Sequence, residues 1–267
     1  MTGRDVWEAG DAYEQYVGRW SRLVARDFLG WLDCAAGWRW LDVGCGTGAL
    51  SAAILERCAP TTLVGIDPSA GFIATARAQS ADPRARFEQG DGQALPLADG
   101  ALDVAVSGLV LNFVADPGAM LREMRRVLRP GGTVALYVWD YAGEMQLMRY
   151  FWDAVAALDP TAGGLDEGVR FPICQPDTLT TLFRNAGLEA VTTGTIDVPT
   201  VFRDFEDYWT PFLGGQGPAP GYCMSLPDER RAALREQLRA ALPVESDGRI
   251  ALVARAWAAR GTVPAAA

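Results

Sequence analysis

Two residue types are missing from this sequence of 267 residues: it has no histidine, and all 24 of its basic residues are arginine, so lysine is absent too. Without lysine the chain can form no Schiff base with a carbonyl compound, and a P-loop would lack its phosphate-binding lysine. Without histidine it can form neither a Ser-His-Asp triad nor a zinc-binding His-Glu-x-x-His helix, and it has no imidazole for acid–base catalysis. These absences exclude several large classes of enzyme.

A basic charge balance, long apolar runs and paired cysteines are also missing. The 33 acidic residues give a net charge of −9, so we expect no nucleic-acid partner. No uncharged apolar run reaches the length of about 18 residues that a membrane span needs, and the N-terminal sequence does not resemble a signal peptide, so we expect a cytoplasmic protein. The five cysteines are widely spaced and form no Cys-x-x-Cys pair, which argues against a disulfide framework and a metal site: Cys34, Cys45, Cys58, Cys174 and Cys223.

What the sequence does contain is an alternation of short apolar runs and helical patterns, which is typical of βαβ units. Apolar runs predict strands at 39–43, 62–66, 85–89, 102–106, 133–139, 188–198 and 250–257. Helices are expected at 47–58, after an N-cap at Ser69, after an N-cap at Asp116, and at 177–185 and 227–242. Pro130-Gly-Gly132 is expected to turn the chain into the fifth strand. The predicted fold is α/β: a Rossmann-like, doubly wound, mainly parallel seven-stranded sheet.

The regular rhythm breaks after Trp139, where aromatic and glycine-rich stretches begin. We therefore expect a core at 37–140, continued at 174–198, with helical and aromatic cap insertions at 141–173 and 199–245. Residues 1–36 would form an N-terminal helical lid, and 246–267 the final core strand and tail. Ligands bind at the carboxyl ends of such sheets, so the cap should supply an acceptor pocket. Its candidate aromatic side chains are Trp139, Tyr150, Trp152, Tyr208, Trp209, Phe212 and Tyr222.

The first predicted strand ends in a glycine loop, Gly44-x-Gly46-x-Gly48, directly before a helix. The first glycine permits a sharp turn, and the second allows a ligand to approach the backbone. Taken alone, the loop also satisfies the dehydrogenase pattern G-x-G-x-x-G/A, and Asp67 lies where a ribose-binding acid is expected. The loop by itself therefore leaves open a nicotinamide-dependent oxidoreductase.

Four motifs in a fixed order resemble those of class I S-adenosylmethionine-dependent methyltransferases. They are Leu41-Asp-Val-Gly-Cys-Gly-Thr-Gly48, Val64-Gly-Ile-Asp-Pro-Ser69, Gly90-Asp-Gly-Gln-Ala-Leu-Pro-Leu-Ala-Asp-Gly-Ala-Leu-Asp-Val104 and Leu128-Arg-Pro-Gly-Gly-Thr-Val134. Within that family the chain is similar to the branch related to ubiquinone/menaquinone-biosynthesis methyltransferases, also called methyltransferase type 11. The resemblance fades after Trp139. It implies S-adenosylmethionine as the cofactor and methyl transfer as the activity.

The resemblance also implies roles for individual residues around the cofactor. Asp42 and the loop Gly44-Cys45-Gly46 would contact the methionine part and the ribose. Asp67 would accept hydrogen bonds from both ribose hydroxyls, with Pro68 against the adenine face. Such carboxylates suit a cationic cofactor without phosphates and would repel a dinucleotide's pyrophosphate.

Further positions complete the site that the resemblance implies. Asp91 would bind the adenine amino group, the backbone of Gly92 and Gln93 would line the ring edge, and Ser107, followed by Gly108, would lie beneath the transferable methyl group. Arg19, in the N-terminal segment from Tyr13 to Trp20, would pair with the cofactor's carboxylate. Asp99 and Asp103 are expected to be solvated residues of a turn and a strand edge.

Methyl transfer needs alignment of nucleophile and methyl group more than a dedicated base. Asp140 and Tyr141 follow the fifth strand, but we assign no catalytic base. The expected acceptor is a small, apolar or aromatic molecule, methylated on oxygen, nitrogen or carbon. Ser107-Gly-Leu-Val110 lacks the Pro-Pro run of methyltransferases that act on DNA bases or glutamine. A protein that binds the cofactor without turnover is the remaining alternative, and the sequence does not indicate an oligomeric state.

Overall fold

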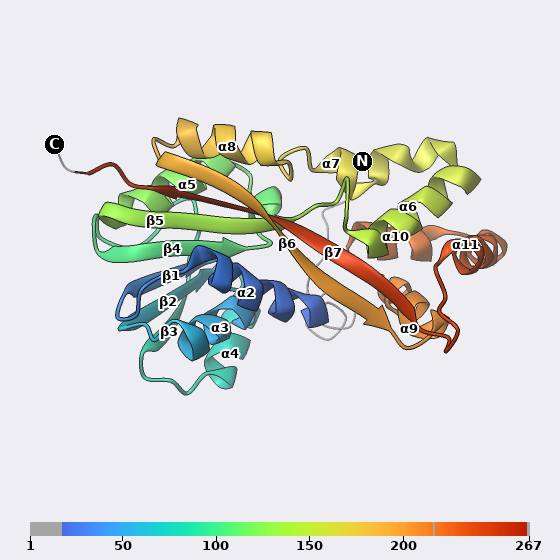
Figure 1. Cartoon of the computed structure of the whole chain (residues 1–267), viewed down its shortest axis with the longest axis horizontal. Helices are drawn as coiled ribbons and strands as arrows, with labels where there is room; N and C mark the ends of the chain where they lie inside the picture. The colour runs from blue at the N-terminus through green and yellow to red at the C-terminus, as the bar shows by residue number, and fades with distance from the viewer. Residues whose placement is uncertain (1–17, 216, 266–267) are drawn as a thin grey trace. The chain divides into compact units, whose positions relative to one another are not determined.

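The seven predicted strands form one sheet in the computed structural model, which describes residues 18–215 and 217–265. The strand order is β3-β2-β1-β4-β5-β7-β6 (Figure 1). The strands are β1 (Arg39–Val43), β2 (Thr62–Asp67), β3 (Ala85–Gln89), β4 (Leu102–Gly108), β5 (Leu128–Trp139), β6 (Glu189–Phe202) and β7 (Ile250–Thr262). The longer helices are α2 (Arg19–Leu32), α3 (Ala49–Arg57), α4 (Ala70–Gln79), α5 (Pro117–Arg126), α6 (Gln146–Leu158), α8 (Pro176–Asn185), α10 (Pro218–Ser225) and α11 (Asp228–Ala241).

Most neighbouring strands of the sheet are parallel. β1 pairs in parallel with β2 and β4, β2 with β3, and β4 with β5. β7 is antiparallel to β5, because the Gly131 N–H donates to the Val263 carbonyl at one end of β5 (3.0 Å) and the Asp140 N–H donates to the Arg255 carbonyl at the other (2.9 Å). The predicted fold class is confirmed.

Local sequence signals account for the helix starts. The Ser69 side chain accepts a hydrogen bond from the Phe72 N–H at the start of α4. The Asp116 side chain accepts one from the Ala119 N–H at the start of α5, and Pro117 occupies the first turn, where no N–H is needed. Both predicted caps are confirmed.

Three strands extend well beyond their predicted bounds. β5 begins at Leu128, and its glycines pair with the end of β7, so Pro130-Gly-Gly132 lies within the strand and not in a turn before it. β6 continues through Pro199 to Phe202 with every second residue buried, and Pro199 points to the exposed face. β7 extends to Thr262. The predicted ends at Val198 and Trp257 were therefore too early.

The chain divides into two compact units, which we name for their contents. Of the described residues, the core unit comprises 21–138, 173–196 and 256–265, and the cap unit comprises 18–20, 139–172, 197–215 and 217–255. Strands β5, β6 and β7 and helix α2 contribute residues to both. In the core unit, α5 packs against α8, and α4 packs against β2 and β3.

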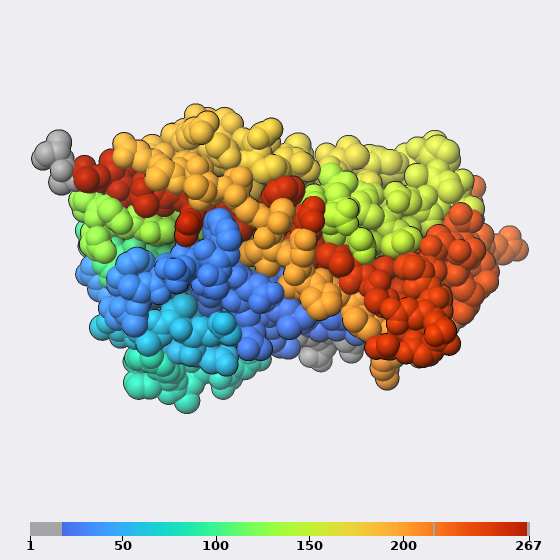
Figure 2. All heavy atoms as spheres, viewed as in Figure 1, coloured from blue at the N-terminus to red at the C-terminus, as the bar shows by residue number. Residues whose placement is uncertain are grey.

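Aromatic side chains form the interior of the cap unit. The rings of Phe151 and Phe212 stack with centroids 4.5 Å apart, and Tyr208 and Trp209 pack beside Phe212. Figure 2 shows α6, in yellow-green, beside the orange-red atoms of α10 and α11. The shorter elements of this unit are η3 (Pro160–Leu165), α7 (Glu167–Arg170), α9 (Phe205–Trp209) and η4 (Thr210–Gly214).

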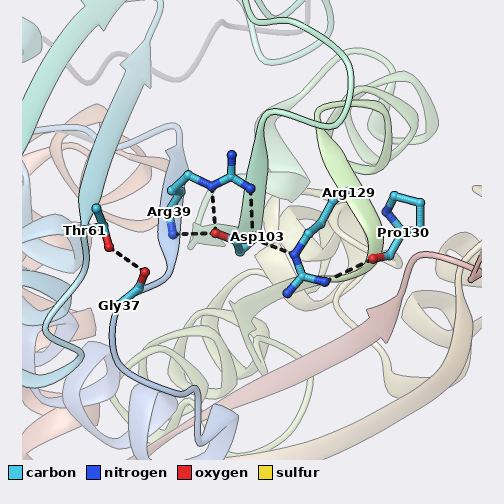
Figure 3. A network of polar contacts seen from close by, with 6 residues as sticks. All are labelled: Gly37, Arg39, Thr61, Asp103, Arg129 and Pro130. Carbon is cyan, nitrogen blue, oxygen red and sulfur yellow. Dashed lines mark hydrogen bonds and ion pairs between the residues drawn. The ribbon is translucent and has the colours of Figure 1, made fainter.

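Asp103 joins the amino ends of three strands of the core unit (Figure 3). Its carboxylate accepts hydrogen bonds from the backbone N–H, Nε and Nη2 of Arg39, at 2.8 to 3.0 Å, and from Nε of Arg129 at 2.6 Å. These contacts, with the Arg39 side chain first, hold the pKa of Asp103 well below its usual range. Asp103 is buried, so the expectation of a solvated residue was wrong. Its role is structural, because ligands bind at the opposite, carboxyl edge.

Candidate active site

The glycine loop directly follows β1 and precedes α3. Gly44, Gly46 and Gly48 have φ angles of +73°, +54° and +94°, a region that favours glycine. A Cβ atom on Gly44 would lie 2.6 Å from Cγ2 of Val110, which follows β4. The first glycine is therefore required both by its backbone conformation and by the close approach of the segment after β4.

The amide groups of this loop are already bound within the protein. The N–H groups of Gly44 and Cys45 both donate to the Ile66 carbonyl, at 2.7 and 3.1 Å. The Gly46 N–H donates to Oδ2 of Asp67 at 3.0 Å. A dinucleotide-binding loop presents such amides to a pyrophosphate. Here they fasten the loop to the end of β2, so the local geometry does not favour the nicotinamide alternative.

Asp42 lies on β1 at the start of the loop and is 1% exposed. Its Oδ2 accepts a hydrogen bond from the Ser51 hydroxyl at 2.6 Å, whereas its Oδ1 is buried without a hydrogen-bond partner. Burial raises the pKa of Asp42 to about 7; the Ser51 hydrogen bond opposes this shift and the charge of Asp67 adds to it. A nearby cation would favour the ionised form of this carboxyl group.

Asp67 ends β2 and is also buried. Its Oδ1 accepts the Ser69 N–H at 2.8 Å, and its Oδ2 accepts the Gly46 N–H. Burial raises the pKa of Asp67, and these two hydrogen bonds lower it in part. A carboxylate oxygen can accept two hydrogen bonds, so both oxygens retain a site for a ligand hydroxyl. Pro68, the next residue, is exposed.

The segment after β3 carries the three predicted adenine contacts. Asp91 is exposed, and its carboxylate accepts hydrogen bonds from the backbone N–H and Nε2 of Gln93, the first at 2.9 Å. The Gln93 Oε1 accepts the Asp116 N–H at 2.8 Å. A Cβ on Gly92 would lie 2.7 Å from Cγ1 of Val43, so this glycine lets the segment pack against the end of β1. The core unit thus brings the segments after β1, β2 and β3 together.

Ser107, at the end of β4, is fully engaged within the fold. Its hydroxyl donates to the Val43 carbonyl at 2.7 Å, which joins β4 to β1. A Cβ on Gly108 would lie 2.5 Å from the hydroxyl oxygen of Tyr137, so a larger residue cannot replace it without movement. Ser107 therefore positions the strand end, and its role toward the methyl group stays a prediction.

Asn112 is a polar residue that sequence reasoning missed. It lies in the short helix η2 (Leu111–Phe113) just after β4, and both polar atoms of its side-chain amide are buried without a hydrogen-bond partner. An unpaired buried polar group costs about 1 to 3 kcal/mol, so such an amide marks a place where a ligand can supply partners. An asparagine after a strand carries no sequence signal of burial.

Arg19 lies in the cap unit, whereas the other predicted cofactor contacts lie in the core unit. Its Nη1 donates to Oδ1 of Asp207 at 3.1 Å. The contact between Arg19 and the cofactor stays a prediction, and the segment before Gly18 lies outside the described residues.

The aromatic residues predicted to line an acceptor pocket are mostly interior residues of the cap unit. Trp139, Trp152, Tyr208, Trp209 and Phe212 are each less than 5% exposed. Tyr222 is only partly buried and lines a cavity of about 210 Å³ between α6, α10 and α11, where its hydroxyl donates to Asp159 at 3.3 Å. Most of these aromatic residues thus stabilise the cap unit.

Two acidic residues of the cap unit are buried. Asp140 accepts the Glu144 N–H at 2.9 Å and shapes the turn after β5. Glu167 is 1% exposed: Oε2 accepts the Trp152 indole N–H, and Oε1 has no hydrogen-bond partner. Burial raises the pKa of Glu167 to about 7. No sequence signal marked Glu167, because its helix α7 is only four residues long.

Two features are not found in the described part of the chain. No group of three or more acidic or cysteine side chains there could hold a metal ion. None of the helices in residues 18–215 and 217–265 is long and apolar enough to cross a membrane. The cysteines described there are all free thiols.

Comparison with known proteins identifies the segment that carries the site. Residues 41–136 match the model of a family described as a methyltransferase domain. The chain is 30% identical over 168 residues to the malonyl-[acyl-carrier protein] O-methyltransferase of Pectobacterium atrosepticum, covering 63% of this chain and 64% of that protein. It is 40% identical over 98 residues to the trans-aconitate 2-methyltransferase of Deinococcus radiodurans, covering 37% of this chain and 36% of that protein. The chain thus spans less than two thirds of these relatives' length.

The fold is shared with solved structures as well. The YcgJ protein of Bacillus subtilis aligns over 91% of this chain and 99% of its own, with a TM-score of 0.60 and 17% identity. This likeness shows a shared Rossmann-like fold, and the matched segment resembles a methyltransferase domain. Residues 41–136 match a methyltransferase domain, so the resemblance is confirmed at that level. The findings support S-adenosylmethionine as the cofactor, while the ubiquinone/menaquinone branch stays a prediction.

Proposed function

We propose that this protein transfers a methyl group from S-adenosylmethionine to a small molecule. The observation that carries the proposal is the pairing of a glycine loop whose amides are occupied with two buried carboxyl groups, Asp42 and Asp67. Such a site suits a ligand with positive charge and ribose hydroxyls but no phosphate. The cofactor set comprises Asp42, Gly44, Cys45, Gly46, Asp67, Pro68, Asp91, Gly92, Gln93 and Ser107, with Asn112 added from its unpartnered amide.

The cofactor supplies an activated methyl group when bound, and the chain's residues hold and align the reactants. Because the chain has no histidine or lysine, an acceptor that arrives already ionised requires the least from the protein. A carboxylic acid is such an acceptor. The two relatives described above are named for acidic acceptors, malonyl-[acyl-carrier protein] and trans-aconitate, which supports the same class. We therefore propose a small acidic acceptor with an apolar or aromatic body.

Calorimetric titration with S-adenosylhomocysteine, the demethylated cofactor, tests the cofactor site. We expect saturable binding that is weakened at least about tenfold by Asp67→Asn, since a carboxylate that accepts hydrogen bonds from two hydroxyls is lost. Ser80→Ala is a control outside the predicted cofactor contacts, since Ser80 caps the carboxyl end of α4. Absence of binding at millimolar ligand would refute the proposal. An increase in NADH fluorescence on titration would instead favour the oxidoreductase.

Turnover is tested with cofactor that carries a labelled methyl group. A panel of small acids, each paired with its neutral amide, should show label transfer to acids. Cofactor binding without transfer to any member of a broader panel that includes phenols and amines would support the non-catalytic alternative. These two experiments separate the cofactor site from the reaction.

A further inference from the structure

The guanidinium group of Arg19 has an unused pair of donors. One nitrogen, Nη1, donates to Asp207 at 3.1 Å. The other edge of the group, formed by Nε and Nη2, is buried and has no hydrogen-bond partner. This edge binds a carboxylate side-on elsewhere in the chain: Nε and Nη2 of Arg255 donate to the two oxygens of Asp197 at 2.7 and 2.9 Å. Arg19 therefore presents an empty fork of the same kind.

The cap unit holds other buried polar groups without a hydrogen-bond partner. Trp20 is 8% exposed, and its indole N–H is buried without a partner. The guanidinium carbon of Arg19 lies 4.5 Å from the centre of the Trp20 ring and 4.8 Å from that of Phe202. Thr200, two residues before Phe202 on the same buried face of β6, also has an unpartnered hydroxyl. Buried polar groups are rarely left unpaired, and here three N–H donors and a hydroxyl are.

Charged groups of both signs surround the fork. Asp207 is the carboxylate to which Arg19 donates, and it also accepts the backbone N–H of Arg203 at 3.0 Å and lies 3.7 Å from the Arg203 side chain. Burial acts to raise the pKa of Asp207, but these contacts outweigh it and hold the pKa below its usual value. Two guanidinium groups thus contact one ionised carboxylate, and the backbone N–H of Asp207 donates to the carboxylate of Asp204 at 2.8 Å. The Nε–Nη2 edge of Arg19 contacts neither acid.

A carboxylate fits these donors best. Its two oxygens match the planar fork of an arginine, and the indole N–H can supply a third hydrogen bond. The rings of Trp20 and Phe202 form an apolar wall beside the fork, which suits an apolar or aromatic group attached to that carboxylate. A phosphate would bring a second negative charge toward Asp207.

We propose that the Nε–Nη2 fork of Arg19 and the indole of Trp20 bind the carboxylate of the methyl acceptor. This inference rests on the proposed function and narrows it, because it makes a carboxylate the recognised group of the substrate. A carboxylate of the cofactor has the same chemistry, and the experiment below distinguishes the two sources.

The test uses the full-length protein saturated with S-adenosylhomocysteine and two probes of the same shape, cinnamate and its neutral amide, cinnamamide. Dissociation constants come from calorimetry or, where binding is weak, from ligand-observed NMR. We expect the wild type to bind cinnamate at least about tenfold more tightly than cinnamamide, because charge-assisted hydrogen bonds are the stronger ones. Arg19→Gln should abolish this preference and leave cinnamamide binding unchanged.

Two variants control for charge and folding. Arg203→Gln removes a positive charge beside the same Asp207 but leaves the fork intact, so it should keep the preference for the acid. Trp20→Phe keeps the aromatic ring and removes one donor, and it should reduce cinnamate binding several-fold even if Arg19→Gln lowers the melting temperature. An equal loss in Arg203→Gln and Arg19→Gln would overturn the fork assignment.

Binding of the cofactor distinguishes the source of the carboxylate. If Arg19→Gln weakens binding of S-adenosylhomocysteine but not of its decarboxylated analogue, the fork binds the carboxylate of the cofactor. The assignment to the acceptor is then overturned. If Arg19→Gln changes the dissociation constant of neither cinnamate nor S-adenosylhomocysteine, the carboxylate site at Arg19 is refuted. Failure of the proposed function is a separate result, because the wild type would then not bind S-adenosylhomocysteine at all.

Discussion

The pH dependence of cofactor binding should be controlled by Asp42. Burial raises the pKa of this carboxyl group to about 7, and one of its oxygens has no partner within the protein. The cofactor carries positive charge on its amino group and, before transfer, on its sulfur. A cation near Asp42 favours the ionised form, so binding should be coupled to release of a proton. Affinity should therefore rise with pH.

The size of the effect follows from the fraction of Asp42 that is ionised in the free protein. With a pKa of about 7 this fraction rises about tenfold between pH 6 and pH 8, and it limits the apparent affinity in the same proportion. The expected change is thus about tenfold in dissociation constant, or about 1.4 kcal/mol. No histidine adds a titration in this range, because the chain has none.

Calorimetry with S-adenosylhomocysteine at pH 6, 7 and 8 measures this dependence. Two buffers with different ionisation enthalpies give the number of protons released. Asp42→Asn should flatten the profile and abolish the proton release, whereas Glu167→Gln, which removes a buried carboxyl group of the cap unit, should leave both unchanged. A wild-type affinity that is independent of pH, or that falls as pH rises, would refute the reasoning.

Three further predictions concern stability. Because burial raises the pKa of Glu167 from 4.5 to about 7, the folded protein binds an extra proton between those values. Between pH 5 and pH 8 the free energy of unfolding in urea should therefore fall by about 2 to 3 kcal/mol less in Glu167→Gln than in the wild type, and an equal slope in both proteins would disprove this. Asp42, whose pKa burial also raises to about 7, adds the same loss to both proteins. Asp103→Asn should lower the free energy of unfolding by about 1 to 2 kcal/mol. The effect should be the same at pH 7 and pH 5, since Arg39 keeps the wild-type carboxylate ionised in this range. If the free energy of unfolding did not change measurably, Asp103 would have no structural role. Gly44→Ala should lower the free energy of unfolding by at least about 1 kcal/mol and weaken binding of S-adenosylhomocysteine, because Gly44 has a positive φ and a Cβ there would contact Val110. Gly163→Ala, whose Cβ would meet open space, should behave as wild type. Similar melting temperatures for the two variants would exclude this explanation.

The sequence predicts the core unit well because its signals are local. β1 and β3 have the predicted bounds, since each is a short apolar run closed by turn residues. The cap at Asp116 with Pro117 fixed the start of α5 within one residue. The glycine loop was recognisable because positive φ angles restrict the residue types in it. These features depend on neighbours in the chain and need no knowledge of the fold.

Features that depend on distant contacts could not be predicted in the same way. Asp103 was expected to be solvated, but its partner Arg39 lies 64 positions earlier. β6 was ended before Pro199, because a proline usually closes a strand, although here it lies on the exposed face. The unpartnered atoms of Asn112, Glu167 and Arg19 become visible only when every possible donor and acceptor around them is placed.

Because the chain has no histidine, the side chains that titrate near neutral pH are buried carboxyl groups. Of the described side chains, Asp42 in the core unit and Glu167 in the cap unit have a pKa of about 7. Ionisation of either group lowers the free energy of unfolding, because burial disfavours both charges, and ionisation of Asp42 in addition strengthens cofactor binding. Raising the pH from 6 to 8 should therefore tighten binding of the cofactor while lowering the free energy of unfolding. A protein in which both properties changed in the same direction would require a titrating group other than these two.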